Sequence, residues 1–189
     1  LYQWDLNRNI DESFFGYLNR LASNPSWSTE NSIAFDATLN GAKKINDMIS
    51  IDSSVYYFSY STSCSKKDPN NGYHIPAESL SLPNYPLCYL MGRININAGD
   101  GFVTDSTWFE NDGTVNTISM IRPFTGKNGA EPMINFKYGE TPQSGIWNFM
   151  GKYNLDHKNF IGFFLDNSDM VDSMFKRFER HASLLYSLP

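Results

Sequence analysis

Asp112 and His157 are the two residues whose types and positions best suit acid–base chemistry. Asp112 stands before Gly113 in an Asp-Gly turn, and His157 follows Asp156 at the end of residues 145–157, which lack a regular period and are expected to form a loop. A histidine titrates near neutral pH, and a carboxylate beside it can hold its ring in one tautomer. The order of acid, then histidine, matches the last two members of a serine–acid–histidine triad.

Two other acids compete with Asp112 as the partner of the histidine. Asp156 adjoins His157, but neighbouring side chains on an extended chain point apart. We therefore expect Asp156 to make hydrogen bonds within its loop. The second rival, Glu110, lies two positions before Asp112.

The segments around both residues belong to three blocks that share one resemblance. The blocks are residues 110–120, residues 145–148 through 156–157, and a run from 12–14 through Leu21, Trp27, Asp36 and 41–42 to 55–61. In content and order they resemble the staphylococcal and thermophilic Bacillus/Geobacillus group of bacterial lipases. The first two blocks look like the acid and histidine loops of that group, which implies Asp112 and His157 as catalytic residues and argues against Glu110.

The resemblance also implies the fold class. We expect an α/β protein, namely the C-terminal half of an α/β-hydrolase fold with its last core strands, lid-side helices, acid and histidine loops and closing helix. A nucleophilic serine requires the elbow motif Gly-x-Ser-x-Gly, and no two glycines of this chain are four positions apart. Residues 1–189 are therefore expected to form a partial domain that lacks the nucleophile-bearing half and, with it, the oxyanion hole.

The function implied by the resemblance is hydrolysis of carboxylic esters. The expected enzyme is a lipase that acts on acylglycerols through a Ser-Asp-His triad, to which this chain supplies Asp112 and His157. Its expected partners are the N-terminal half of the same hydrolase and a lipid or ester substrate at a lipid–water interface, and the chain alone is expected to be inactive. The alternatives are a phospholipase A1-type activity and a non-catalytic structural or storage relative. Survival of both residues inside dense matches favours the enzyme.

Composition bounds the class of protein. With 189 residues, 41% hydrophobic and 15% aromatic, the chain suffices for one globular domain. A net charge of −5 with singly spread Lys and Arg offers no basic surface for nucleic acid. No apolar run approaches the ~20 residues of a membrane span. Because Leu1 is not a methionine, we expect a processed, truncated or first-ordered start, with any export signal gone. The expected location is secreted or vesicular, that is, extracytoplasmic.

The chain has too few cysteines for a disulfide framework, and its cysteines and histidines do not suggest a metal site. Cys64 and Cys88 flank a polar loop and could either clip it, which would favour an oxidising compartment, or remain free thiols. His74 and His181 have no Cys, His or Asp at metal-ligand spacing. Both histidines are interpreted as structural.

Metal sites implied by the resemblance find weak support in the residues. A calcium site would lie just after the histidine, where Asn159 replaces a carboxylate; Asp166 and Asp169 could rebuild it, although helix capping explains them as well. A zinc ligand would fall at Asn31, beside Glu30, and an amide is a poor zinc ligand. No cofactor is therefore assigned, calcium is only weakly supported, and zinc is not expected.

Periodicity and turn residues predict the elements that position these residues. In chain order they are an amphipathic helix at 11–23, a helix at 38–49, a buried strand at 55–61, a long loop at 63–86, a short apolar run at 87–92 at a loop or helix edge, a helical or extended start at 117–121, an irregular excursion at 126–139, a strand at 160–165, and a closing helix at 169–185 capped by 166–168. In the first helix, Phe15 and Tyr17 are candidate lid or pocket aromatics, or simply pack that helix.

Two strands cannot close a sheet, so apolar surface should remain uncovered in the chain alone. The closing helix has an apolar stripe of Val171, Met174, Phe175, Phe178, Ala182 and Leu185, opposite a charged side, with Lys176, Arg177, Glu179 and Arg180, that is expected to be solvated. The side chains expected to be exposed are Phe58, Tyr60, Ile161, Phe163, Met174 and Phe178.

Overall fold

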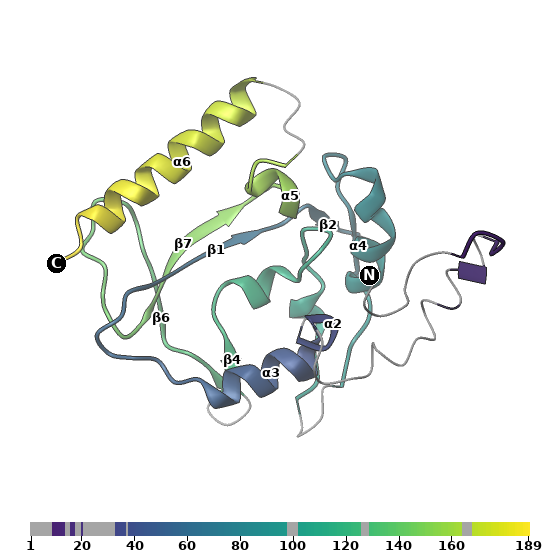
Figure 1. The fold of residues 1–189 in the computed structure, drawn as a ribbon, viewed down its shortest axis with the longest axis horizontal. Helices are drawn as coiled ribbons and strands as arrows, with labels where there is room; N and C mark the ends of the chain where they lie inside the picture. The colour runs from purple at the N-terminus through teal and green to yellow at the C-terminus, as the bar shows by residue number, and fades with distance from the viewer. Residues whose placement is uncertain are drawn as a thin grey trace. The chain divides into compact units, whose positions relative to one another are not determined.

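The computed structural model divides the chain into two compact units, Leu1–Met48 and Ile49–Pro189. The residues that the structure describes are 9–13, 16–17, 20, 33–36, 38–97, 102–125, 129–163 and 168–189 (Figure 1). Both Asp112 and His157 belong to the second unit.

The first unit contains two helices, α2 (Ile33–Asp36) and α3 (Leu39–Met48). The helix predicted at 38–49 is confirmed, with each end one residue further in. Thr38 caps α3, because its hydroxyl accepts a hydrogen bond from the Gly41 amide at 3.1 Å.

Most of the helix predicted at 11–23 lies outside the described residues. This part includes Phe15, one of the two aromatics considered for a lid, whereas Tyr17 lies in a helical turn. Glu30 and Asn31, the positions considered for zinc, also lie outside the described residues.

A three-stranded parallel sheet crosses the second unit (Figure 1). Its strands are β1 (Tyr57–Thr62), β7 (Trp147–Tyr153) and β6 (Met133–Asn135), with β7 in the middle. β1 confirms the strand predicted at 55–61. The loop predicted at 145–157 is wrong over the whole of β7.

The sequence of β7 hides its strand character because a polar side chain occupies an interior position. Asn148 and Met150 are buried and alternate with less buried neighbours. The Asn148 amide is fully buried and donates to the carbonyl oxygens of Gln143 at 2.8 Å, Tyr57 at 3.0 Å and Ile146 at 3.1 Å. A polar residue in the core breaks the apolar alternation by which strands are recognised.

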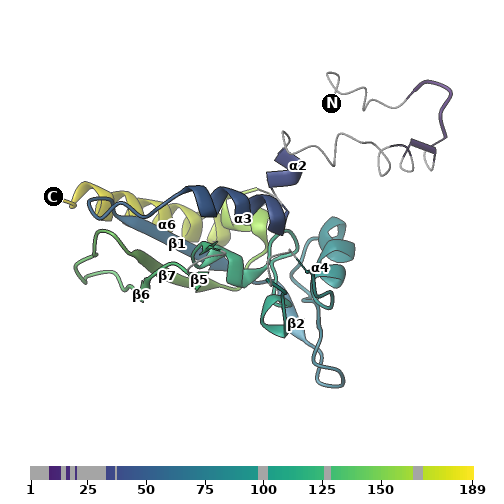
Figure 2. The ribbon, with the colours of Figure 1, turned by 90° about the horizontal axis from the view of Figure 1, so that it is seen from below.

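The segment predicted as a long loop at 63–86 contains regular structure. β2 (Ser65–Lys67) and β3 (His74–Pro76) form an antiparallel hairpin, and the 3-10 helix η3 (Leu82–Asn84) leads into α4 (Tyr85–Met91). The apolar run at 87–92 is therefore mostly helix. The hairpin and α4 lie beyond the carboxyl ends of β1 and β7 (Figure 2).

Cys64 and Cys88 are buried free thiols. Together with Leu80 they form a small core cluster. Burial raises the pKa of both thiols, to about 11 for Cys88, so both stay protonated near neutral pH. Of the two alternatives left open by the sequence, the structure has the free pair, which packs as small apolar side chains.

The remaining short elements lie between α4 and β7. They are the 3-10 helices η4 (Ser106–Trp108) and η5 (Thr117–Met120), and a hairpin of β4 (Phe124–Thr125) with β5 (Gly129–Ala130). η5 agrees with the helical reading of 117–121. The segment predicted to be irregular at 126–139 contains β5 and β6.

Two helices follow β7, namely α5 (His157–Phe160) and α6 (Ser168–Tyr186). α6 confirms the closing helix, while its predicted caps Asp166 and Asn167 lie outside the described residues. The strand predicted at 160–165 is wrong as far as Phe163, because Phe160 ends α5 and a turn follows it. Phe160 instead packs, since its ring lies 5.5 Å from that of Tyr60 and 5.6 Å from that of Tyr153.

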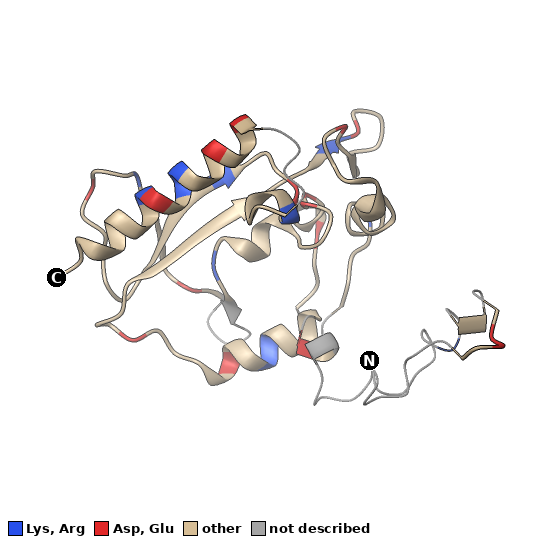
Figure 3. Ribbon diagram, turned by 45° about the horizontal axis from the view of Figure 1, so that its top comes forward, with Lys and Arg blue, Asp and Glu red and all other residues tan. Residues whose placement is uncertain are grey.

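α6 runs along one face of the sheet (Figure 1). His181 Nδ1 lies 3.0 Å from the Tyr60 hydroxyl. The Arg177 guanidinium lies over the rings of Phe160 at 4.4 Å and Tyr153 at 4.9 Å, and donates to the Phe160 carbonyl at 2.8 Å. The expectation that Arg177 is simply solvated is therefore wrong, although Figure 3 shows acidic and basic residues spaced along the helix.

Part of the apolar stripe of α6 stays exposed. No residue of the helix is buried, and Phe175 is 63% exposed. This exposed stripe consists of Phe175, Phe178, Ala182 and Leu185. Of the six side chains expected to be exposed, Ile161, Phe163 and Phe178 are exposed, while Phe58, Tyr60 and Met174 are half-buried. No helix among the described residues is both long and apolar enough to cross a membrane.

Candidate active site

Asp112 is held by a tight turn. Its side chain is fully buried, and Oδ1 accepts the backbone N–H groups of Thr114 at 3.0 Å and Val115 at 2.8 Å. Gly113 has φ +90°, a left-handed conformation that favours glycine. A Cβ atom at this position would also lie 2.6 Å from Leu80 Cδ1. The turn therefore fixes the direction of the carboxylate.

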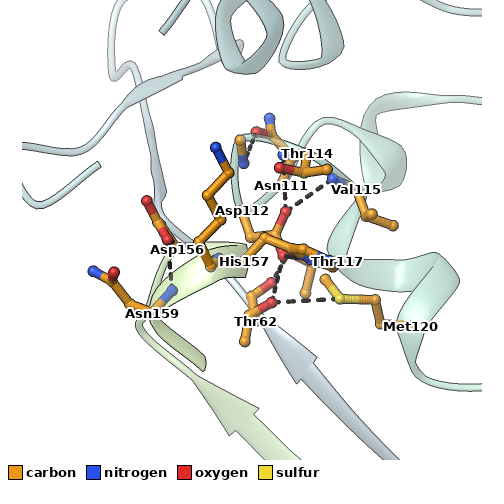
Figure 4. Close-up of polar contacts among 12 residues, drawn as sticks. Thr62, Asn111, Asp112, Thr114, Val115, Thr117, Met120, Asp156, His157 and Asn159 are labelled. Atoms are coloured by element: carbon orange, nitrogen blue, oxygen red, sulfur yellow. Dashed lines mark hydrogen bonds and ion pairs between the residues drawn. The ribbon is translucent and has the colours of Figure 1, made fainter. Parts of the chain in front are cut away.

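His157 meets this carboxylate as the first residue of α5. Its Nδ1 lies 2.8 Å from Asp112 Oδ2, as predicted (Figure 4), and its backbone N–H donates to the Asp112 carbonyl at 3.4 Å. Because the carboxylate accepts, Nδ1 carries the proton and Nε2 keeps its lone pair. The His157 side chain is 39% exposed while that of Asp112 is 0% exposed. The acid is thus sealed inside, and the histidine can be reached from outside.

Thr62 completes the set of donors around the carboxylate. Its hydroxyl donates at 2.5 Å to Asp112 Oδ2, the oxygen that also meets His157. Thr62 is the last residue of β1 and pairs with Tyr153, the last residue of β7. The acid and the histidine therefore meet at the carboxyl ends of parallel strands, where the sites of α/β sheets gather.

Asp156, the first rival acid, caps the helix that carries the histidine. Its Oδ1 accepts the backbone N–H groups of Lys158 and Asn159, both at 2.9 Å, and Oδ2 accepts from the Ser81 hydroxyl. Burial acts to raise the pKa of Asp156, but the hydrogen bonds from Ser81, Asn159 and Lys158 outweigh it and hold this pKa below its ordinary value. The expectation that Asp156 makes loop hydrogen bonds is confirmed.

Glu110, the second rival acid, forms an ion pair with a lysine. Its Oε1 lies 2.5 Å from Lys152 Nζ. Partial burial acts to raise the pKa of Glu110, but hydrogen bonds from Lys152 and Ser63 and the charge of Lys152 lower it overall. Glu110 therefore forms an ion pair beside the site.

The other two histidines have partners of their own. His74 Nδ1 lies 3.0 Å from the Ser65 hydroxyl, and His181 Nδ1 lies 3.0 Å from the Tyr60 hydroxyl. Burial lowers the pKa of both imidazoles. These contacts agree with the structural roles predicted for His74 and His181.

The residues that the structure describes do not fit a metal site. They contain no group of three or more His, Cys, Asp or Glu side chains that could hold an ion. Asn159 Oδ1 is buried without a hydrogen-bond partner, but one amide oxygen falls far short of the roughly six to eight ligands of calcium. Asp166 lies outside the described residues, as do Glu30 and Asn31.

Comparison with known proteins identifies the family. A family model described as "Lipase-like, C-terminal domain" matches residues 1–183. The chain belongs to this lipase-like C-terminal domain family. Lipase 2 of Staphylococcus aureus (strain MRSA252) is 31% identical over 169 residues, which are 88% of this chain and 22% of that protein. The resemblance to staphylococcal lipases predicted from the sequence is thereby confirmed.

Two solved structures share the fold of this chain. EstA from Clostridium botulinum is 30% identical, with a TM-score of 0.73 over 100% of this chain and 42% of that one. The lipase of Staphylococcus hyicus shares the fold at 23% identity, with a TM-score of 0.72 over 96% of this chain and 44% of that one. The lipase-like chain is thus a mixed fold of helices and a parallel sheet, consistent with the α/β class, and spans less than half of either structure.

Sequence reasoning missed two residues of this lipase-like domain that hold the pair. Thr62 directly follows the strand predicted at 55–61. Because sites of α/β sheets lie at the carboxyl ends of parallel strands, this position could have marked its hydroxyl as part of the site. Ser81 carried no such signal. It lies in the predicted long loop, and only the folded chain brings it to Asp156.

Proposed function

We propose that this chain supplies the acid, Asp112, and the base, His157, of a Ser-His-Asp triad in a lipase-like carboxylic ester hydrolase. The observation that carries the proposal is the 2.8 Å contact between His157 Nδ1 and the buried Asp112 Oδ2. It lies in a chain of the lipase-like C-terminal domain family whose histidine keeps an exposed edge. Acylglycerols and related esters are the proposed substrates, because relatives such as Lipase 2 of Staphylococcus aureus are named lipases.

The mechanism follows from the orientation of the imidazole. With Nδ1–H directed at Asp112, His157 Nε2 takes the proton of a serine hydroxyl as that oxygen attacks the ester carbonyl. Nε2 then gives the proton to the departing alcohol, which leaves an acyl-enzyme. A water molecule, deprotonated by the same nitrogen, releases the acid and restores the serine. Asp112 stabilises the imidazolium in both steps and keeps the productive tautomer.

The serine and the oxyanion hole are proposed to come from an N-terminal half of the same hydrolase. Two features of the chain support this partner. β1 has β7 on one side and no strand on the other among the described residues, and the stripe of Phe175, Phe178, Ala182 and Leu185 has no cover. We propose that residues 1–189 are a partial domain whose sheet and closing helix are completed by that half, and that the chain alone is inactive.

The experiment uses a polypeptide that contains both halves. We expect it to hydrolyse p-nitrophenyl esters and emulsified triacylglycerol and to be labelled once by a serine-directed phosphonate, which intact mass would show. His157→Ala should abolish turnover while leaving the circular dichroism spectrum unchanged. A folded protein with both halves that neither turns over esters nor takes the label would refute the proposal, and would favour a non-catalytic relative.

A further inference from the structure

We infer that Thr62 is a positioning residue for the acid of the pair. The inference rests on the proposed function, because it assigns Thr62 a role toward Asp112 and His157. Its hydroxyl holds Oδ2 of Asp112 in line with the imidazole and shares the charge of that oxygen, which sets how strongly the carboxylate retains the imidazolium proton.

The surroundings of Thr62 leave its hydroxyl one good acceptor. The residue is 3% exposed, so bulk water does not compete. Oγ1 lies 2.5 Å from Asp112 Oδ2 and 3.4 Å from Met120 Sδ, and a thioether is a weak acceptor. The backbone carbonyl of Thr62 is held by the Thr117 hydroxyl at 2.7 Å. A β-branched side chain on a backbone fixed in this way has little rotational freedom.

The pairing of β1 with β7 is irregular just before Thr62. Strict alternation would send Ser59 and Thr62, three positions apart, to opposite faces of the sheet. Both nevertheless contact the end of η5, since Ser59 Oγ donates to the Ile121 carbonyl and Thr62 Oγ1 lies near Met120. The register shifts between Ser59 and Ser61, because β7 advances three positions where β1 advances two. The extra residue lies in β7, and such a bulge increases the local twist of the pair beside the end of β1.

Thr62 and His157 share one oxygen of Asp112, Oδ2, and this determines what losing the Thr62 hydroxyl would do. Oδ1 of Asp112 is held by two backbone amides, whereas the partners of Oδ2 among the described residues are Thr62 and His157. Without the hydroxyl, Oδ2 keeps more of its charge in a buried place and attracts the imidazolium more strongly. The carboxyl group is also freer to rotate away from the ring. The histidine then releases its proton at higher pH and is less well oriented as a base.

The test is a matched set of variants in the polypeptide with both halves. In Thr62→Val, the acid side of the pH profile of kcat/KM should move up by about half to one pH unit, with kcat at its optimum reduced about tenfold. Thr62→Ser, which keeps the hydroxyl, should restore the wild-type profile. Ser59→Ala removes a buried hydroxyl of the same strand that donates to the Ile121 carbonyl rather than to Asp112, and should lower stability without moving the profile. Thr62→Ala serves as a second hydroxyl-free variant if Thr62→Val does not fold.

A readout without turnover separates this inference from the proposed function. Histidine-selective 15N NMR follows the titration of His157 directly, and its midpoint should shift in Thr62→Val and Thr62→Ala but not in Thr62→Ser. A shift in a protein that hydrolyses no ester would support the role of Thr62 and reject the proposed function. The inference is overturned if the hydroxyl-free variants of Thr62 titrate like the wild type, or if Ser59→Ala produces the same shift.

Discussion

Two buried carboxylates lie close to the histidine, and their partners separate their roles. Asp112 and Asp156 are 0% and 1% exposed, so both must be fully hydrogen-bonded to offset the loss of water. One oxygen of Asp112 contacts the ring of His157, whereas both oxygens of Asp156 accept hydrogen bonds from Ser81 and from the amides at the start of α5. Of these two acids, Asp112 is therefore the one whose carboxylate contacts the imidazole.

Asparagine substitutions should therefore separate the two acids. Asp112→Asn keeps the shape but presents an amide donor to Nδ1, which selects the wrong tautomer, and kcat should fall by about 10⁴. Asp156→Asn keeps an oxygen for the helix cap, where Asn and Asp are nearly equivalent, and should cost less than about tenfold. Steady-state ester hydrolysis by the protein with both halves measures each. A larger loss for Asp156→Asn than for Asp112→Asn would reverse the assignment.

Asp156 also predicts a pH-dependent contribution to stability. Its pKa is lower in the folded chain than in the unfolded one, so the stabilisation is complete above the unfolded value near 3.8 and is lost as pH falls through the folded value. Ser81→Ala should lower the free energy of unfolding by about 1.5–3 kcal/mol at pH 7, and the difference should shrink below about pH 4. Urea unfolding of the protein with both halves, between pH 7 and pH 3, checks this.

Ser79→Ala is the control, because Ser79 Oγ lies 3.3 Å from Cys64 Sγ rather than near a carboxylate. Its effect on stability should not vary over the same pH range. A Ser81→Ala effect that is equally constant would contradict the coupling to Asp156.

At the scale of elements, the pair depends on how two turns are built. The acid turn uses Gly113 and the backbone amides of Thr114 and Val115, while the histidine is placed by a four-residue helix capped by Asp156. Neither element has an apolar stripe of its own. Their precision comes from backbone hydrogen bonds and from close packing at Gly113.

Gly113→Ala should show both contributions. The left-handed φ of +90° costs about 1–2 kcal/mol for alanine, and the contact with Leu80 should add about 1–3 kcal/mol. Gly139 is a matched control, since it has φ +99° but nothing within 4 Å of an added Cβ. Thermal unfolding should therefore show the larger loss for Gly113→Ala, with activity lost in this variant alone. Equal losses would mean that Leu80 moves aside freely.

Elements with a clear local sequence pattern could be predicted, whereas elements fixed mainly by hydrogen bonds and tertiary packing could not. α3 and α6 carry clear apolar periodicity, and β1 is rich in aromatic residues between turn residues, so all three were predictable to within a few residues. β7 was missed because the buried Asn148 breaks its pattern. The apolar run after His157 was mistaken for a strand. Its first residue, Phe160, packs against Tyr60 and Tyr153 from the end of α5, and Ile161 and Phe163 are exposed. The acid and histidine were predictable because they occur in family-specific loops, while Thr62 and Ser81 reach them only through tertiary contacts.

At the scale of the whole molecule, the uncovered stripe of α6 indicates how the chain should behave alone. Phe175 and Phe178 are 63% and 46% exposed on a helix that buries no residue. Expressed by itself, the chain should aggregate or bind a hydrophobic dye, unfold without cooperativity and show no esterase activity. A soluble monomer that unfolds cooperatively would mean that residues 1–189 form a complete domain.

Variants of the stripe test its proposed cover. Replacing Phe175 and Phe178 by Ser should raise the solubility of the isolated chain and weaken its association with a separately produced N-terminal half. Lys176→Ser, on the charged side of α6, should change neither property. Size-exclusion chromatography and ultracentrifugation of the mixed halves measure both. Unchanged association of the double variant would place the contact elsewhere.

The parallel pairing of β1 with β7 also has a kinetic consequence. Asn148 and Tyr57, which the pairing brings together, are 91 positions apart, and closing so long a loop is slow compared with forming a local turn. The turn at Asp112 forms through contacts to Thr114 and Val115, whereas Thr62 and His157 arrive with the ends of β1 and β7. During refolding the turn should therefore form early, and the carboxylate should reach its final orientation only when both strand ends are in place, so hydrolytic competence should be among the last properties to return.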